Sequence, residues 1–224
     1  MNTDDRKDLV FDELAVVGKA FGSAKRLMLV ELLAQGERTV EGLARAAGMG
    51  VSTVSAHLQV LKLANLVRTR REAQKVHYRL AGDDVLHLYA AMRAVARERS
   101  ADVERALEAY LALPGSDDVR LVSQAELAAQ LADGQVVVLD VRPPEEFVAG
   151  HIPGARSVPL GALAGHAAEL RAAREVIAYC RGSFCVMAHD AVRLLEAEGV
   201  TARRLEDGML EWRSAGLPVE VGVA

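Results

Sequence analysis

One short break divides the chain into halves that follow different patterns. Proline and glycine interrupt the sequence between Leu113 and Asp118, and a helix cannot continue through them. Before the break, most stretches repeat apolar residues at helical spacing, whereas short apolar strands alternate with helices after it. Halves of about 100 residues each have the usual size of a domain. We therefore predict two domains, residues 1–113 and residues 119–224.

Composition restricts the class of protein. Apolar residues make up 51% of the chain and charged residues 26%, which is typical of folded globular proteins. No apolar stretch approaches the roughly 20 residues of a membrane-spanning helix, and the acidic N-terminal segment lacks the features of a secretory signal. The two cysteines, Cys180 and Cys185, are too few for a disulfide scaffold or a cysteine-rich zinc site. We therefore expect a cytoplasmic protein that has no contact with a membrane and holds neither a metal nor a cofactor.

The pattern of the first half predicts four helices, a hairpin and a long final helix. The four helices are expected over residues 5–17, 24–34, 40–47 and 52–63. The last of these four has one apolar stripe, made by Val54, Leu58 and Leu61. Over residues 67–80 the period changes to two, which is typical of a two-stranded hairpin with one cationic outward face. Helical periodicity then returns from Asp84 to Leu113.

The helix over residues 52–63 and the hairpin together suit DNA recognition. With the apolar stripe inward, small and hydrogen-bonding side chains face outward, and such a helix fits a major groove about 12 Å wide. The hairpin would add salt-sensitive affinity for phosphates, because residues 62–79 carry six basic side chains against one acidic one. On charge alone, a solvated hairpin is the simpler interpretation. The expected DNA contacts are Ser52, Thr53, Ser55, Ala56, His57 and Gln59 on the helix, and Arg68, Arg70, Arg71 and Lys75 on the hairpin.

These residues carry a family resemblance. The run VSTVSAHLQVLK over residues 51–62, followed by ANLV over 64–67 and VHYRL over 76–80, resembles the ArsR/SmtB repressors. The resemblance covers roughly residues 8–110. It implies a winged helix-turn-helix domain that binds double-stranded operator DNA as a homodimer, joined through its first and last helices.

The last predicted helix supports a dimer independently, since apolar residues recur along it at the spacing of a helix seam. These residues are Val85, Leu88, Met92, Val95 and Ala96. Packing against its own domain is the alternative interpretation. Many members of the resembled family sense metals through cysteines or through sets of histidine and carboxylate ligands. The first half has no cysteine, so we expect no direct sensing of metal or arsenite there.

The second half predicts an α/β domain with a parallel central sheet. Ser123 and Glu126 form a capping box that opens a helix ending near Ala132. Two continuous apolar runs, over residues 136–141 and 176–179, are typical of strands buried on both faces. Helices are expected over residues 145–148 and from about residue 186 to 198, and this alternation indicates a sheet covered by helices.

The second strand delivers a cysteine to a loop that enters a helix. Backbone amides and the positive end of a helix dipole favour thiolate over thiol, so Cys180 is predicted to be an ionised, solvent-accessible nucleophile. Arg181 adds positive charge, and Gly182 lets the loop bend so that its amides point inward. A buried, inert cysteine after a strand is the alternative that geometry alone leaves open.

An ordered series of motifs around this loop resembles the rhodanese family over residues 119–222. The series is LDVR at 139–142, EEF at 145–147, GHIPGA at 150–155 and LEDG at 205–208. The resemblance implies that Cys180 carries a sulfane sulfur as a persulfide. It also implies that the loop cradles the anionic donor through Arg181, Gly182, Ser183 and Phe184 and ends at Cys185. Asp140, Arg142 and His151 match motif positions that we assign to anchoring the loop rather than to chemistry.

Two departures from that pattern concern the loop. The helix after it ends at Gly199, about two residues later than we expect, so the loop could prefer a different anion. Cys185 is a second thiol, which either resolves a persulfide on Cys180 into a disulfide or polysulfide bridge or is a spectator.

Together the two halves support three hypotheses of function. The first is a repressor whose rhodanese domain couples reactive sulfur or another thiol-reactive anion to operator binding. The second is a sulfurtransferase whose winged helix serves autoregulation or targeting. The third and weakest is that the second domain handles arsenate or a related oxyanion.

Overall fold

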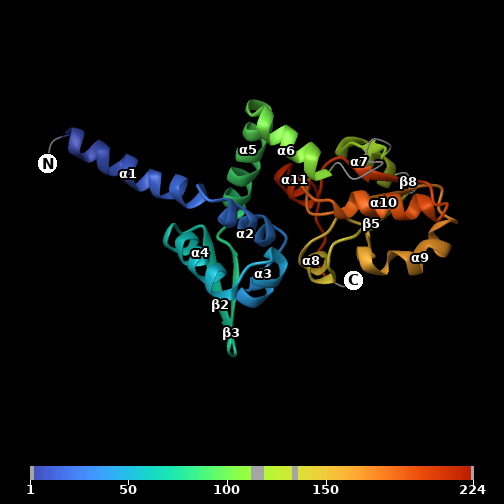
Figure 1. The fold of residues 1–224 in the computed structure, drawn as a ribbon, viewed down its shortest axis with the longest axis horizontal. Coiled ribbons are helices and arrows are strands. Elements are labelled where there is room, and N and C mark those ends of the chain that lie inside the picture. Colours follow the sequence, from blue (N-terminus) through green and yellow to red (C-terminus); the bar gives the residue numbers. More distant parts are fainter. Residues whose placement is uncertain (1–2, 112–118, 133–135, 223–224) are drawn as a thin grey trace. The chain divides into compact units, whose positions relative to one another are not determined.

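The computed structural model describes residues 3–111, 119–132 and 136–222 (Figure 1). The chain forms two compact units, Met1–Tyr89 and Ala90–Ala224. The predicted break between Leu113 and Asp118 lies outside the described residues. None of the described helices is long and apolar enough to cross a membrane.

The first unit is mainly helical. Its elements are α1 (Thr3–Phe21), α2 (Ala24–Ala34), β1 (Arg38–Thr39), α3 (Val40–Ala47), α4 (Val51–Leu63), β2 (Val67–Glu72), β3 (Lys75–Leu80) and the first half of α5 (Asp83–Arg99). The three strands form an antiparallel sheet in the order β1-β3-β2. This arrangement confirms the predicted winged helix-turn-helix.

Local chemistry explains the turn between α3 and α4. The side chain of Thr39 caps α3 by accepting a hydrogen bond from the amide of Gly42 at 3.1 Å. Gly48 ends the helix in the left-handed region, with φ of 60°, where glycine avoids the strain of a side chain. The predicted stripe of α4 is confirmed, since its three apolar residues are fully buried.

The long helix predicted from Asp84 is instead two helices. Within the described residues, α5 ends at Arg99 and α6 (Ala101–Leu111) begins two residues later. Ser100 separates them, and its carbonyl accepts hydrogen bonds from the amides of Val103 and Glu104. Acidic residues in the first turn of α6 favour a new helix start at this position.

The second unit is an α/β sandwich, which confirms the predicted parallel sheet. Its five parallel strands lie in the order β4-β8-β7-β5-β6. They are β4 (Leu121–Val122), β5 (Val137–Asp140), β6 (Arg156–Ser157), β7 (Val176–Tyr179) and β8 (Ala202–Leu205). The other elements are α6, α7 (Gln124–Ala132), α8 (Pro144–Ala149), η2 (Leu160–Ala162), α9 (Leu163–Leu170), α10 (Met187–Ala197) and α11 (Met209–Ser214).

Each face of this sheet packs against its own apolar cluster. On one face, Val176 and Ala178 of β7 join residues of α9 and α10. On the other, Ile177 and Tyr179 join residues of α7 and α11. Successive residues of a strand point to opposite faces, so the next residue after β7, Cys180, continues on the face of α9 and α10. This alternation places Cys180 in the apolar cluster that includes Val176 and Ala178.

Candidate functional site

The predicted DNA-facing residues of α4 lie on one side of the helix. Ser52, Thr53, Ala56 and Gln59 are exposed, while Ser55 and His57 are half-buried. The amide nitrogen of the Gln59 side chain donates to the hydroxyl of Tyr78 on β3 at 3.4 Å. The first unit therefore presents a small-residue helix face beside its hairpin.

The hairpin arginines differ in their partners. Arg70 is paired within the unit, with Nη2 at 2.6 Å from Glu37 Oε1 and Nη1 at 2.8 Å from Glu72 Oε2. These hydrogen bonds raise the pKa of Arg70 above its ordinary value. Arg68, Arg71 and Lys75 are exposed and have no ion-pair partner among the described residues. Of the four side chains predicted to contact phosphate, Arg70 is therefore the least available for binding DNA, because its charge is already paired.

The structure contradicts the prediction of an ionised, accessible thiol at Cys180. Its side chain points into the apolar cluster with Val176 and Ala178, and the residue is 1% exposed. Burial, followed by a hydrogen bond to the Cys185 side chain, raises the pKa of Cys180 well above its ordinary value. Its sulfur also lies 3.4 Å from the carbonyl oxygen of Cys185. Cys180 is therefore a protonated thiol that donates a hydrogen bond.

The pKa of the second thiol, Cys185, is shifted in the opposite direction. The hydrogen bond from the Cys180 thiol, then the amides of Met187 and Arg181, and the charge of Arg181 together lower the pKa of Cys185 to about 7. Cys185 belongs to the same apolar cluster as Cys180, is 9% exposed and lies at the entry to α10.

The predicted ring of amides around a single sulfur does not form. The amides of Ala188 and Gly182 serve Cys180, while two other amides serve Cys185. The amide of Ser183 points at Glu211 Oε1, at 3.4 Å, rather than into an anion cradle. The loop thus divides its amide donors between two sulfur atoms.

Two elements hold the loop backbone in place. The amides of Met209 and Leu210 in α11 donate to the carbonyls of Cys180 and Arg181 at 3.0 and 2.9 Å. Gly208 approaches so closely that a Cβ there would lie 2.6 Å from the Cys180 carbonyl oxygen and would collide with the Gly182 backbone.

From the other side, α8 holds the predicted substrate-binding residue Arg181. Its Nη2 lies 2.6 Å from Oε1 of Glu146, whose side chain is 1% exposed. A carboxylate buried this completely needs such a pairing, because an unpaired buried charge is costly.

The motif residues Asp140 and Arg142 form a buried network beside the loop. Arg142 Nη2 lies 2.5 Å from Asp140 Oδ2 and donates to the carbonyl of Gly150 at 2.7 Å. The hydroxyl of Tyr179 donates to Asp140 at 2.7 Å. His151 stacks on the ring of Phe147, with 3.7 Å between ring centroids. These contacts tie the ends of β5 and β7 to the segment after α8.

Local sequence patterns did not predict the roles of four residues, of which three lie around the cysteine loop and one, Glu37, lies beside the hairpin. Glu146 and Glu37 pair with arginines far away in the chain. Glu211 caps α11 through the amide of Gly208 at 3.1 Å, a pattern that sequence analysis can detect. Arg93 of α5 contacts Ser183 and Phe184, and no local sequence signal marks it.

The comparisons with known proteins agree with this architecture. Residues 23–69 match the bacterial regulatory proteins of the arsR family, and residues 123–215 match the rhodanese-like domain. HTH-type transcriptional regulator Rv0324 of Mycobacterium tuberculosis is 50% identical over 218 residues, which cover 97% of this chain and 95% of that protein. This chain belongs to the ArsR family of transcriptional regulators. The regulator carries a rhodanese-like domain in addition, and both resemblances predicted from its motifs are confirmed.

Each half of the regulator also has relatives of its own. A sulfurtransferase of Allochromatium vinosum is 29% identical over 103 residues, which cover 45% of this chain and 94% of that protein. A solved structure is described as the homodimeric winged helix-turn-helix DNA-binding domain, fragment 1–100, of Mb0332 from Mycobacterium bovis. It is 47% identical, covers 45% of this chain and 93% of that chain, and has a TM-score of 0.42.

Proposed function

We propose that this ArsR-family regulator binds operator DNA as a homodimer and changes its operator affinity when its cysteine pair takes up reactive sulfur. The observation that carries the proposal is a pair of free thiols in one loop, in which the sulfur of Cys180 donates to the carbonyl oxygen of Cys185 at 3.4 Å. Both cysteines of the chain are in this loop. A DNA-binding protein with all its thiols at one such site is suited to respond to thiol-reactive molecules.

The exposed face of α4 supports the DNA part of the proposal. Its small residues permit close approach to base edges, and Gln59 offers a hydrogen-bonding group. Arg68, Arg71 and Lys75 on the hairpin supply charge for phosphate contacts. Binding would therefore weaken as salt concentration rises.

The homodimer is supported by apolar side chains that the first unit leaves uncovered. On α1, Leu9, Val10, Phe11 and Leu14 are each more than half exposed. Apolar residues grouped in this way on one helix indicate a surface that another chain covers. A second copy of α1 from a partner subunit is the occupant we propose.

The chemistry begins at Cys185 in this account, not at Cys180. The Cys185 thiolate attacks the sulfane sulfur of a polysulfide or thiosulfate, a persulfide forms on Cys185, and the rest of the donor leaves as a shorter polysulfide or as sulfite. Cys180 then loses its proton and attacks the Cys185 sulfur. This step forms the Cys180–Cys185 disulfide and releases hydrogen sulfide, so that both thiols are oxidised and the donor sulfur is reduced.

Operator titrations test this proposal directly. Fluorescence anisotropy of labelled operator DNA is measured with the wild type and with Cys185→Ser, each before and after exposure to polysulfide. We expect the wild type to change its affinity by fivefold or more, a typical allosteric coupling being about 5–150-fold, and Cys185→Ser to show no change. An unchanged wild-type affinity after full loading with sulfur would refute the sensing role.

A second candidate function is sulfur transfer by the rhodanese-like domain, with the winged helix serving autoregulation or targeting. The match over residues 123–215 and the similarity to a sulfurtransferase favour it. The burial of Cys180 disfavours rapid turnover, because a donor and an acceptor must both reach the carrier sulfur. Steady production of thiocyanate from thiosulfate and cyanide, abolished by Cys180→Ser, would establish the enzyme. Single-turnover loading without steady production would favour the sensor.

A further inference from the structure

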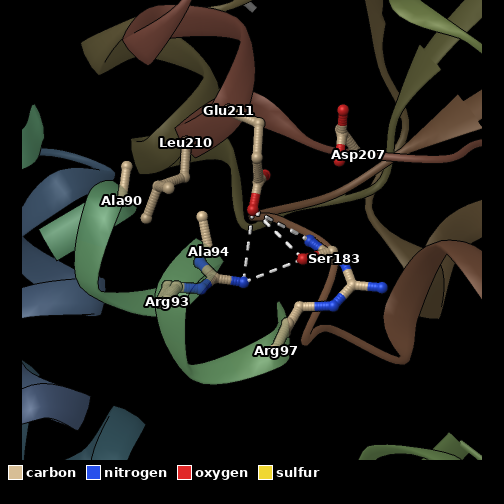
Figure 2. A pocket seen from close by; sticks show the side chains of 8 residues that line it. All are labelled: Ala90, Arg93, Ala94, Arg97, Ser183, Asp207, Leu210 and Glu211. Atoms are coloured by element: carbon tan, nitrogen blue, oxygen red, sulfur yellow. Dashed lines mark hydrogen bonds and ion pairs between the residues drawn. The ribbon is translucent and has the colours of Figure 1, made fainter. Parts of the chain in front are cut away.

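A buried arginine of α5 contacts the two residues that separate Gly182 from Cys185. Arg93 is 6% exposed, and its guanidinium lies over the ring of Phe184 at 4.0 Å from the centroid. Its Nη2 donates to Ser183 Oγ at 3.1 Å (Figure 2). A flat guanidinium can stack on a ring and donate in its own plane at once, which a lysine cannot do.

Glu211 completes this cluster and compensates the buried charge. Its Oε1 lies 3.2 Å from Arg93 Nη2 and accepts from the hydroxyl and the amide of Ser183 at 3.2 and 3.4 Å. Its Oε2 accepts from the amide of Gly208 at 3.1 Å. Figure 2 shows Arg93 and Glu211 converging on Ser183 at one side of a small pocket of about 160 Å³. The positions of Ser183 and Phe184 therefore determine which contacts Arg93 makes.

Oxidation of the cysteine pair must move these two residues. In the reduced loop, the amide of Cys185 donates to the Gly182 carbonyl at 3.0 Å, which closes a tight turn around Ser183 and Phe184. A disulfide joins the two sulfurs at about 2.05 Å and removes the thiol proton that Cys180 donates to the carbonyl oxygen of Cys185 at 3.4 Å. A persulfide instead adds a sulfur atom among closely packed groups. Either product displaces the turn that Arg93 contacts.

The helix that carries Arg93 also belongs to the DNA-binding unit. α5 is continuous from Asp83 to Arg99, and its first half, which contains the buried residues Val85, Leu86 and Tyr89, belongs to the first unit. A group on the second half of one helix is in a position to change the tilt or the stability of the whole helix. Coupling between two sites requires this kind of element, with contacts that differ between two states.

We propose that Arg93 is the positioning residue through which the chemical state of the cysteine loop acts on α5. This inference rests on the proposed function and adds the contacts through which a chemical change in the cysteine loop reaches α5. In the reduced protein, Arg93 is held by Phe184, Ser183 and Glu211. After oxidation the turn moves, these contacts are exchanged for others, and α5 takes a different arrangement.

The test compares Arg93→Lys with Arg97→Lys in the full chain. Both substitutions conserve charge, and Arg97 lines the same pocket one turn along α5, but its side chain is 42% exposed and pairs with Glu104. Each variant is loaded with polysulfide. Its mass and its operator affinity are measured before and after loading, and a Phe184→Leu variant removes the stacking partner without touching α5.

We expect Arg93→Lys to load sulfur as the wild type does, and we expect both Arg93→Lys and Phe184→Leu to bind operator normally when reduced. Their change of affinity on loading should fall below about twofold, whereas Arg97→Lys keeps the wild-type response. The emission of Trp212, the only tryptophan of the chain, should still change on loading in Arg93→Lys, because neighbouring Glu211 contacts Ser183 directly.

Three outcomes would overturn the inference. The first is a full operator response in both Arg93→Lys and Phe184→Leu. The second is failure of Arg93→Lys to load sulfur, which would place Arg93 in the chemistry and not in transmission. The third is an equal loss of response in Arg97→Lys. A wild type that loads sulfur without any operator response would instead refute the proposed function, and the inference with it.

Discussion

At the scale of single residues, the main feature is that the pKa values of two thiols five positions apart are shifted in opposite directions. Strand alternation turns Cys180 into the apolar cluster, where its thiol stays protonated and donates to its neighbour. Cys185 receives that hydrogen bond together with two backbone amides. In the proposed chemistry, the thiol that the motif marks as the sulfur carrier therefore stabilises the ionised form of the second one.

Removing the Cys180 donor should raise the pKa of Cys185. In Cys180→Ala we expect the pH midpoint of Cys185 alkylation by iodoacetamide to move upward from about 7 toward the ordinary thiol value, because the largest stabilising contact of the thiolate is lost. The rate of modification across pH, followed by mass spectrometry, gives the midpoint. An unshifted midpoint would show that the amides alone ionise Cys185.

The same pKa shift predicts how stability depends on pH. The pKa of Cys185 is lower in the folded state than its ordinary value of 9.0, so its ionised form favours folding. That contribution is fully present above pH 9.0 and is lost as the pH falls through about 7. Urea unfolding of the wild type and Cys185→Ser between these limits measures it. We expect the stability difference between the two to grow in favour of the wild type as pH rises, and a flat difference would contradict the shift.

Close backbone approach makes Gly208 sensitive to substitution. In Gly208→Ala the new methyl group collides with the Gly182 backbone, and we expect a loss of stability of about 1–3 kcal/mol or more. Gly165→Ala on α9 is the matched control, because no atom lies within 4 Å of a Cβ there. Thermal unfolding compares the two, and equal midpoints would show that the loop and α11 are less tightly apposed than described.

At the scale of elements, the hairpin combines one internally paired arginine with unpaired ones. Arg70 is neutralised by Glu37 and Glu72, while Arg71 on the same strand has no such partner among the described residues. Phosphate affinity should therefore depend on Arg71 more than on Arg70.

Salt titrations distinguish the two arginines. Arg71→Ala should lower the slope of log affinity against log salt concentration by about one and weaken binding to all DNA sequences alike. Arg70→Ala should change the slope by much less, since its charge is already compensated. Equal slopes for the two variants would show that Arg70 leaves its carboxylates when DNA binds.

The uncovered face of α1 gives a second prediction at this scale. Leu14 is 64% exposed, and Leu14→Lys would place a charge in the proposed dimer contact. We expect a weaker dimer by sedimentation and operator affinity lowered by about tenfold or more, given roughly 1.5–3 kcal/mol for burying a leucine. Dimers of unchanged strength would exclude this face of α1 as the subunit contact.

At the scale of the whole molecule, local patterns were sufficient to predict most of the fold. The helix period of α4 and the apolar run of β7 predicted both elements, because a buried face imposes its own spacing. β8 was not predicted because it is rich in arginine, and Arg203 is half-buried only through pairs with Glu175 and Glu126. A pairing between distant residues leaves no trace in local periodicity.

The site was less predictable than the fold for the same reason. The motif locates the cysteine loop, but the pKa of each thiol depends on which face of the sheet it meets and on which amides reach it. Alternation along β7 does indicate the burial of Cys180, since it follows Val176 and Ala178 at a period of two. Arg93 lies 90 positions from Ser183 in the chain, and only the folded structure brings the two together.

The most direct test of this account is the mass of single-cysteine variants after exposure to polysulfide. We predict that Cys180→Ser gains one sulfur atom and keeps it, because Cys185 is the attacking thiolate and its resolving partner is absent. Cys185→Ser should remain unmodified on the same timescale, because its remaining thiol is buried and protonated. Sulfur loading of Cys185→Ser together with an unmodified Cys180→Ser would contradict the account.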